Sequence, residues 1–205
     1  MNAPISPETL KTVLEKHLLW LDDKPGGECA DLENANLKNA DLRNADLRNA
    51  NLENADLRNA NLRYANLRNA NLRNANLRYA NLENANLENA NLEDANLRYA
   101  NLENANLEDA NLRYANLDHT CLRNATINWN SHDLISEILK RSAKTTNQFM
   151  IVGLILIKWD WCWNHFYEEI VDPETRNWIQ TTLNMYVKEG DGHPVYISNK
   201  PITTL

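Results

Sequence analysis

The chain has 205 residues and a formal net charge of -7, with 21 Lys and Arg against 28 Asp and Glu. A length of this order suits one domain or two small ones, and the acidic balance argues against direct binding to nucleic acid. No apolar run approaches the ~18 residues of a membrane span, so we expect no contact with a membrane.

The N-terminus and the cysteines predict a cytoplasmic protein. The first residues lack a basic segment followed by an apolar one, which a secretion signal requires. Cys29, Cys121 and Cys162 are widely separated and show no CxxC spacing. That pattern is typical of a reducing compartment and predicts no disulfide framework.

Residues 1–29 are expected to form a capping helix and a lead-in. Ser6 can cap the helix, Pro7 suits its first position and Glu8 its first turn. The residues of the predicted apolar face are Leu10, Val13, Leu14, Leu18 and Leu21. The helix should end near residue 21, before the Lys-Pro-Gly-Gly run at 24–27.

A five-residue unit of the form Ala-Asn/Asp-Leu-x-x recurs from Ala30 to Trp129. Counting Leu32 and every fifth residue to Leu122, with Ile127 as the last, gives 20 units without insertion. A helix repeats its faces at about 3.6 residues and a strand at about 2, so neither alone buries every fifth residue. The remaining interpretation is a solenoid, in which stacked coils bury a continuous core.

Units such as Ala35-Asn36-Leu37-Lys38-Asn39 resemble the pentapeptide-repeat proteins. The resemblance implies a mainly β fold, a right-handed quadrilateral parallel β-helix of about five coils over residues 30–129. It also implies that the central Leu and the Ala two before it point inward. The segment from Glu15 to Ala30 is similar to the lead-in of many bacterial and phage members. A helix there would close the open edge of the first coil.

Within such a solenoid, side chains 20 residues apart would lie one above another at about 4.8 Å. The Asn or Asp beside each Leu should serve the tight turns and hydrogen-bond along its column. The outward positions then form four unequal faces. One face is a basic column with tyrosines that should stack directly: Lys38, Arg58, Arg78, Arg98, Tyr79 and Tyr99.

Two further faces divide into a basic and an acidic half, and the fourth mixes both signs. The basic block is Arg43, Arg48, Arg63 and Arg68. The acidic block is Glu83, Glu88, Glu103, Glu108 and Asp109. Two interpretations stay open. The faces are a solvated surface of alternating charge, or the two blocks of different molecules meet in an antiparallel homodimer.

Beyond the repeat, residues 130–187 are predicted to form a helical subdomain and residues 188–205 a loop or tail. Ser131 can cap a helix whose apolar residues are Leu134, Ile135, Ile138 and Leu139. A buried helix is expected over 149–157, and a turn or helix after Asp160 would carry Trp161, Cys162, Trp163 and Phe166. A last helix from Pro173 would bury Trp178, Ile179, Leu183 and Tyr186. The Trp-rich part resembles an extension of some bacterial pentapeptide repeats, and forms either a small core or a recognition surface.

No arrangement of residues predicts catalysis, a cofactor or a metal. Cys162 and His165 would approach each other on a helix, but two ligands do not make a zinc site. His132 with Asp133, and Cys121 near His119, are equally incomplete. The acidic block offers no concave pocket in which paired carboxylates would act. We therefore expect a protein that is not an enzyme.

Three classes of function remain open. The first is a protein-protein interaction or scaffold module that presents charged faces on a rigid rod to an unidentified protein partner. The second follows from the resemblance, because some pentapeptide-repeat proteins protect DNA gyrase by mimicking duplex DNA. Against it, the position after the central Leu or Ile carries 11 Lys or Arg and eight acids. The third is a purely structural self-assembling module, which a helix cap at each end disfavours.

Overall fold

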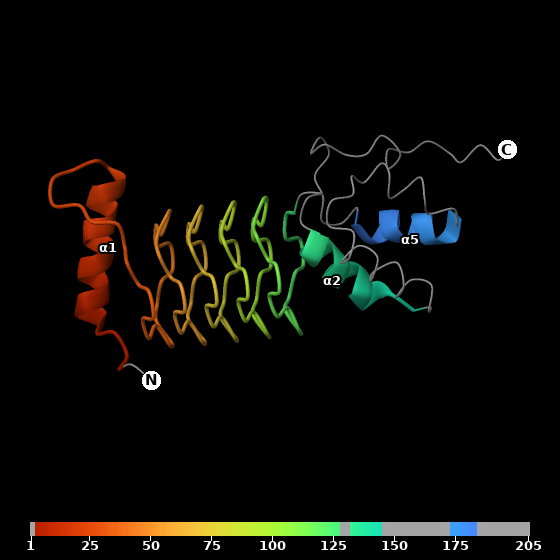
Figure 1. Ribbon diagram of the computed structural model, residues 1–205, viewed down its shortest axis with the longest axis horizontal. Coiled ribbons are helices and arrows are strands. Elements are labelled where there is room, and N and C mark those ends of the chain that lie inside the picture. The colour runs from red at the N-terminus through yellow and green to blue at the C-terminus, as the bar shows by residue number, and fades with distance from the viewer. Residues whose placement is uncertain (1–2, 128–131, 145–172, 184–205) are drawn as a thin grey trace. The chain divides into compact units, whose positions relative to one another are not determined.

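The computed structural model describes residues 3–127, 132–144 and 173–183. The chain divides into two compact units, Met1–Thr126 and Ile127–Leu205. The first unit contains helix α1, Pro7–Leu21, followed by a series of stacked coils (Figure 1). The second contains helices α2, His132–Ser142, and α5, Pro173–Leu183. No helix in the described ranges has both the length and the apolar character needed to cross a bilayer.

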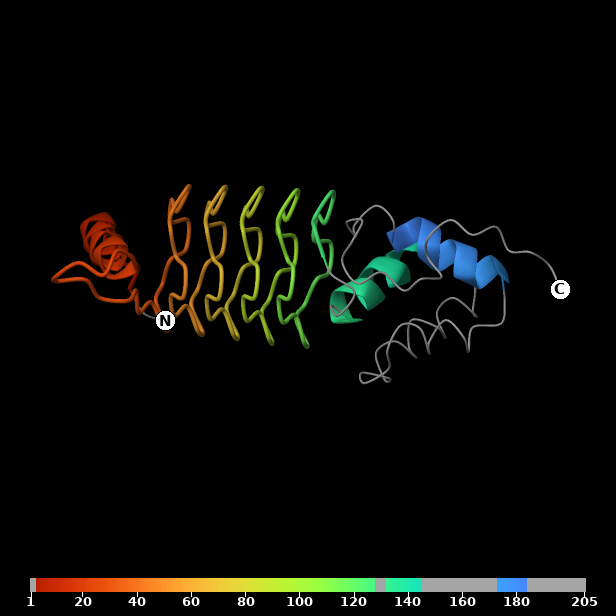
Figure 2. The same ribbon diagram turned by 90° about the horizontal axis from the view of Figure 1, so that it is seen from above.

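The coils stack at a spacing of 20 residues. Single parallel β-bridges join the residue before each central Leu to the residue 20 positions later, from Asp31 with Asn51 to Asn106 with Thr126. Because every fifth residue takes part, four ladders of bridges run along the stack. Each coil therefore contains four units, one on each side, as the resemblance implied (Figure 2).

The corner of each unit is made by the second residue after the central Leu. From Asn34 to Asn124 this residue has a φ between 55° and 61°, in the left-handed region that Asn and Asp tolerate best. We expected the residue before Leu to make the turn, and its backbone instead forms the β-bridge. Its side chain does support the corner, as when Asn66 Oδ1 accepts the Arg68 N–H at 3.3 Å.

The short sides of the coils explain why the described residues form isolated bridges rather than continuous strands. A corner in every unit leaves only the residues around the bridge extended. Successive coils are nevertheless joined in both directions: Leu32 N–H donates to Asn51 O at 2.7 Å, and Asn51 N–H donates to Ala30 O at 2.9 Å. The solenoid is thus built from parallel backbone pairing without long strands.

The core is a column of leucines enclosed by alanines. Every central Leu from Leu32 to Leu122 is at most 5% exposed, and Ile127 is fully buried. The alanines from Ala50 to Ala105 are at most 1% exposed. The inward assignment of both positions is confirmed. Each buried Leu contributes about 1.5 to 3 kcal/mol of transfer free energy, before the loss of chain entropy is subtracted.

Helix α1 begins and ends where the sequence predicts. Ser6 Oγ accepts the Thr9 N–H at 3.1 Å, which satisfies one of the free donors of the first turn. After Leu21 the chain turns back along the helix. A Cβ atom on Gly27 would lie 2.3 Å from the backbone nitrogen of Trp20, so this return path requires glycine.

The segment around α1 covers part of the edge of the first coil. Pro4 forms a parallel bridge with Asn36, and Ile5 N–H donates to Asn36 O at 3.0 Å. His17 Nδ1 accepts the Ala30 N–H at 3.0 Å. These contacts replace bonds that a preceding coil would make, so the open edge is partly satisfied within the chain.

The buried face of α1 differs from the predicted one. Leu18, which we expected to be buried, is 48% exposed, whereas His17 is fully buried. The hydrogen bond from Ala30 holds His17 against the coil. Helical geometry then turns the next residue about 100° away from it.

Two of the predicted C-terminal helices lie within the described residues. Helices α2 and α5 pack against each other. Their buried apolar residues are Ile135, Ile138 and Leu139 in α2 and Ile179 in α5. These positions confirm the predicted apolar faces. Outside the description lie the expected helix over 149–157, Trp161, Cys162, Trp163, Phe166, Tyr186, the segment 188–205 and the side chains of Leu134 and Leu183.

Leu77, in a middle coil, tests the contribution of the core. Leu77→Ala should lower the free energy of unfolding by about 2 to 5 kcal/mol, because it removes buried methyl groups and leaves a cavity. Leu77→Lys should prevent the coils from folding, because an ammonium among leucines loses its hydration. Arg73→Lys, on the exposed surface, is the control and should change the melting temperature little. A Leu77→Lys protein that melts like the wild type by circular dichroism would contradict the inward assignment.

His17 makes the stability of the N-terminal cap depend on pH. Its Nδ1 accepts a hydrogen bond from Ala30, which requires the neutral imidazole. Burial lowers the pKa of His17 from its ordinary value of 6.5, although the charge of Asp46 opposes the change. Because the folded pKa is the lower one, the contribution of His17 is complete above about pH 6.5 and is lost as the pH falls toward the folded pKa.

We predict a steeper loss of thermal stability in the wild type than in His17→Gln between about pH 7.5 and about pH 5.5. The Gln amide oxygen can accept the same N–H without titrating. Calorimetric melts across this range measure both slopes. Parallel profiles for the two proteins would show that His17 is not the titrating group.

Candidate functional site

The outward positions form the expected columns, and most of their cations are compensated within the molecule. Of the 11 Lys and Arg just after a central residue, seven lie within 3.5 Å of a carboxylate oxygen. These seven are Arg43, Arg48, Arg58, Arg63, Arg68, Arg73 and Arg123. The charged surface is therefore largely a set of internal ion pairs.

Half of the basic block is neutralised by aspartates that the sequence analysis overlooked. Arg43 Nη2 lies 2.6 Å from Asp41 Oδ2, and Arg48 Nη2 lies 2.7 Å from Asp46 Oδ2. Both pairs come from the sequence Asp-Leu-Arg, which places the carboxylate and the guanidinium on one side of a coil. Asp where most units have Asn was the available signal. Hydrogen bonds from Arg43 hold the pKa of Asp41 below its usual range.

The other half of the basic block pairs with the acidic block along the columns. Arg63 Nη2 lies 3.0 Å from Glu83 Oε1, and Arg68 Nη2 lies 3.1 Å from Glu88 Oε1. Each pair joins residues 20 apart, where the basic half of a face meets the acidic half. Glu103 is paired in the same way with the following coil. The antiparallel homodimer would compete with these contacts, and it stays a prediction.

The basic column differs from the other three faces. Its Arg58 is ion-paired, but no carboxylate of the described residues lies within 4.0 Å of a nitrogen of Arg78 or Arg98. Each of these guanidiniums instead covers the tyrosine that follows it. Arg78 Cζ lies 5.5 Å from the centre of the Tyr79 ring, and Arg98 Cζ lies 4.9 Å from that of Tyr99. Such cation–π contacts hold the cations beside the rings.

The tyrosines of this column form the predicted stack. The rings of Tyr79 and Tyr99 have centres 5.0 Å apart and planes inclined by 1°. His119 extends the stack, with its ring centre 4.8 Å from that of Tyr99. The tyrosines remain accessible, at 52% and 38% exposure. We call Arg78, Tyr79, Arg98, Tyr99 and His119 the arginine–tyrosine face.

Two other tyrosines occupy the same position in their units without forming a stack. Arg63 Cζ lies 5.4 Å from the Tyr64 ring centre, and Arg113 Cζ lies 4.8 Å from that of Tyr114. The residues 20 positions from Tyr64 are both Asn, so its ring has no aromatic neighbour in the column. The stack is therefore specific to the arginine–tyrosine face.

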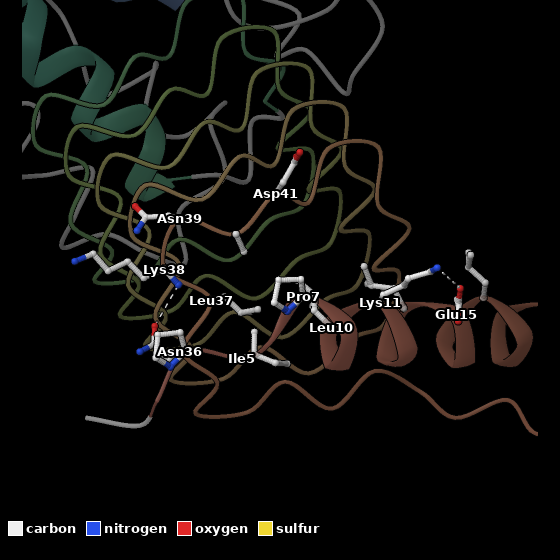
Figure 3. A pocket seen from close by; sticks show the side chains of 14 residues that line it. Ile5, Pro7, Leu10, Lys11, Glu15, Asn36, Leu37, Lys38, Asn39 and Asp41 are labelled. Atoms are coloured by element: carbon white, nitrogen blue, oxygen red, sulfur yellow. Dashed lines mark hydrogen bonds and ion pairs between the residues drawn. The ribbon is translucent and has the colours of Figure 1, made fainter.

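A groove of about 460 Å³ lies between α1 and the first coil (Figure 3). Its lining includes Leu10 and Leu14 of the helix and Leu37 and Ala40 of the coil. Ala40 is only half-buried here, unlike the corresponding alanines of the middle coils. The expectation that the helix closes the first coil is thus correct for only part of the edge.

The candidate chemical groups remain isolated in the described part of the chain. Among those residues, no three His, Cys, Asp or Glu side chains are grouped so that they could hold a metal ion. Cys29 and Cys121 are free thiols, and burial together with the charge of Asp31 raises the pKa of Cys29. Cys162, His165 and the side chains of His132 and Asp133 lie outside the description.

Coils of 20 residues, with one buried Leu on each side and variable residues outside, define a four-sided parallel β-solenoid. The chain belongs to the pentapeptide-repeat family. The family model for pentapeptide repeats matches in eight copies, over residues 28–63, 55–94 and 90–128. No curated protein matches the sequence.

Several solved pentapeptide-repeat structures are similar to this chain. HetL, involved in heterocyst differentiation regulation in the cyanobacterium Nostoc sp. strain PCC 7120, is 36% identical over 49% of this chain and 50% of its own, with a TM-score of 0.41. Rfr23 from the cyanobacterium Cyanothece 51142 is 46% identical over 44% and 58% of the two chains, with a TM-score of 0.30. The Nostoc protein alr5209 is 34% identical over 63% and 87%, with a TM-score of 0.22. The present chain thus covers 50% of HetL and 58% of Rfr23.

The corner tyrosines allow a matched test of the stack. Tyr64 and Tyr99 have φ values of 59° and 60°, a conformation that Asn adopts more readily. Tyr64→Asn should therefore leave the free energy of unfolding unchanged or raise it. Tyr99→Asn should be less favourable than Tyr64→Asn by about 0.5 to 1.5 kcal/mol, because Tyr99 stacks on both neighbours. Urea denaturation measures the difference, and equal effects would show that the stack does not stabilise the fold.

Proposed function

We propose that this protein is a non-enzymatic interaction or scaffold module that binds a protein partner through the arginine–tyrosine face. The contrast between this face and the other columns carries the proposal. Seven outward cations are paired with carboxylates of the same chain, whereas Arg78 and Arg98 lie beside exposed aromatic rings. Arg and Tyr are among the residues that most often dominate binding at protein interfaces.

The backbone of the solenoid supports this role by holding the face in place. Tyr79 N–H donates to Arg98 O at 3.2 Å, and Tyr99 N–H donates to Asp118 O at 3.0 Å. Each corner of the face is therefore bonded to the following coil. A surface organised before binding loses less conformational entropy when the partner docks, which favours recognition by few side chains.

A cytoplasmic location is part of this proposal. Cys29 and Cys121 are unpaired and exposed in the described part of the chain. Exposed thiols of this kind persist in reducing compartments and are prone to oxidation outside them. Oxidation-free protein recovered from the cytoplasm is therefore the form to which the proposed function refers.

A DNA-mimicking protein that acts on gyrase is an alternative with weaker support. Mimicry of duplex DNA requires negative charge that is not compensated within the protein. In the acidic block, Glu83, Glu88 and Glu103 each form an ion pair with an arginine of the same chain. A gyrase supercoiling assay, with and without a fluoroquinolone, separates this alternative from the proposal.

A self-assembling structural module is the remaining alternative. Stacking of one first coil on another molecule would require access to its edge, which Pro4, Ile5 and His17 partly occupy. Side-by-side assembly of the charged blocks would compete with the Arg63–Glu83 pair. Light scattering at low salt distinguishes an assembling protein from a monomeric binder.

Charge reversal on the arginine–tyrosine face tests the proposal. Arg78→Glu combined with Arg98→Glu should reduce capture of the partner at least about tenfold, because it removes two donors and repels an acidic partner. Arg43→Glu combined with Arg73→Glu changes the net charge equally on other faces and is the matched control. Quantitative cross-linking and affinity capture compare the recovered proteins. Equal loss with the control pair would show a dependence on total charge, and unchanged recovery with the first pair would refute the proposal.

A further inference from the structure

Arg78 lacks the carboxylate that completes an equivalent arginine on a neighbouring face. Arg63 Cζ lies 5.4 Å from the Tyr64 ring centre, and its Nη2 donates to Glu83 Oε1 at 3.0 Å. Arg78 lies at almost the same distance, 5.5 Å, from the tyrosine that follows it. The residue 20 positions beyond it, where Arg63 finds Glu83, is Arg98. A second cation therefore stands where the acceptor would be.

The environment of the guanidinium is the same in these arginines. Nε of Arg63, Arg78 and Arg98 is buried and has no hydrogen-bond partner among the described residues. The Nη groups are thus the donors that an acceptor can reach. In Arg63 this acceptor is the carboxylate of Glu83. For Arg78 and Arg98 an oxyanion from outside the chain would make the same contact.

The two cations also form an unusual pair of charges. Residues 20 apart in a column lie about one strand spacing from each other, about 4.8 Å, and like charges at that distance repel. Asp118 follows Arg98 in the column but forms no ion pair with it within 4.0 Å. An anion placed between the two guanidiniums would remove the repulsion. The charge to be matched is that of two cations.

We propose that Arg78 and Arg98 together bind the phosphate monoester of a phosphorylated side chain on the partner protein. At neutral pH this group carries a charge of about -1.5 to -2 and offers three acceptor oxygens, enough for both guanidiniums. A carboxylate carries one charge and would leave one cation uncompensated. The planar guanidinium suits bidentate contact with phosphate, and the adjoining tyrosines provide area for the residues around the phosphorylated one.

The inference rests on the proposed function, because the phosphate alone would contact little beyond the two guanidiniums. Its chemistry separates it from other anionic ligands. Inorganic phosphate shares the charge without the neighbouring residues, and a nucleic-acid phosphodiester carries a single charge on each phosphate. These two ligands therefore serve as comparison arms.

The test uses the full chain and short acetylated, amidated peptides that contain phosphoserine, Ser or Glu between glycines. Isothermal titration measures affinity, and amide NMR shifts of Arg78, Tyr79, Arg98 and Tyr99 locate the site. We expect the phosphopeptide to bind at least about tenfold more tightly than the Glu peptide, inorganic phosphate or a thymidine oligonucleotide. Equal binding of the Glu peptide, equal binding of either comparison arm, or no shift at these amides would overturn the assignment.

Variants decide which residues are responsible. Arg78→Gln and Arg98→Gln should each weaken phosphopeptide binding about tenfold, and Arg43→Gln, on another face, less than about twofold. Arg98→Glu recreates the Arg63–Glu83 arrangement and should abolish binding while the protein remains folded by circular dichroism. Retained binding in Arg98→Glu, or equal losses in Arg43→Gln, would refute the inference.

A further arm separates failure of the inference from failure of the proposed function. Lysate proteins are captured before and after phosphatase treatment, with the Arg78→Glu, Arg98→Glu double variant alongside. Capture that needs these arginines and is lost after phosphatase treatment supports both statements. Capture that needs them but survives the treatment removes the phosphate and leaves the interaction face standing.

Discussion

One residue in every unit adopts the left-handed backbone conformation, and the rest of the solenoid depends on it. With φ between 55° and 61°, this corner turns the chain after each short side, so that four units close a coil. The fifth residue of each side can then return a leucine to the centre. Asn and Asp fill most corners because they tolerate this conformation at low cost. Tyr64, Tyr79, Tyr99 and Tyr114 occupy it as well, and the Arg–ring contacts and the Tyr79–Tyr99 stack are therefore built on strained positions.

The repeat predicted the fold closely because burial at every fifth residue leaves few geometries. The inward leucines, the 20-residue spacing and the start of α1 all follow from sequence patterns that report on local conformation. The exposed Leu18 and the buried His17 did not follow. Their positions are set by one tertiary hydrogen bond, from the Ala30 N–H to His17. An apolar periodicity contains no information about such a polar contact.

The charged surface was predictable in its columns but not in its contacts. Spacing alone placed Tyr79 above Tyr99, and the rings do stack. It also suggested a basic block with charge to offer, whereas Arg43 and Arg48 are paired with aspartates two residues earlier. Those aspartates were treated as part of the structural repeat, and so their charge was not counted. The exceptional status of Arg78 and Arg98 emerges only after every neighbouring pair is known.

Each outward side chain has its vertical neighbours 20 residues away, which gives the surface an address system of its own. Insertion of a single five-residue unit would preserve the alternation of corners and buried leucines. It would also rotate everything after it by one side of the coil, so that Arg63 no longer faced Glu83 and Tyr79 no longer lay above Tyr99. Insertion of a whole coil would keep every side in phase. A lineage that lengthens such a protein while retaining its surface must therefore add four units together, although the core accepts them singly.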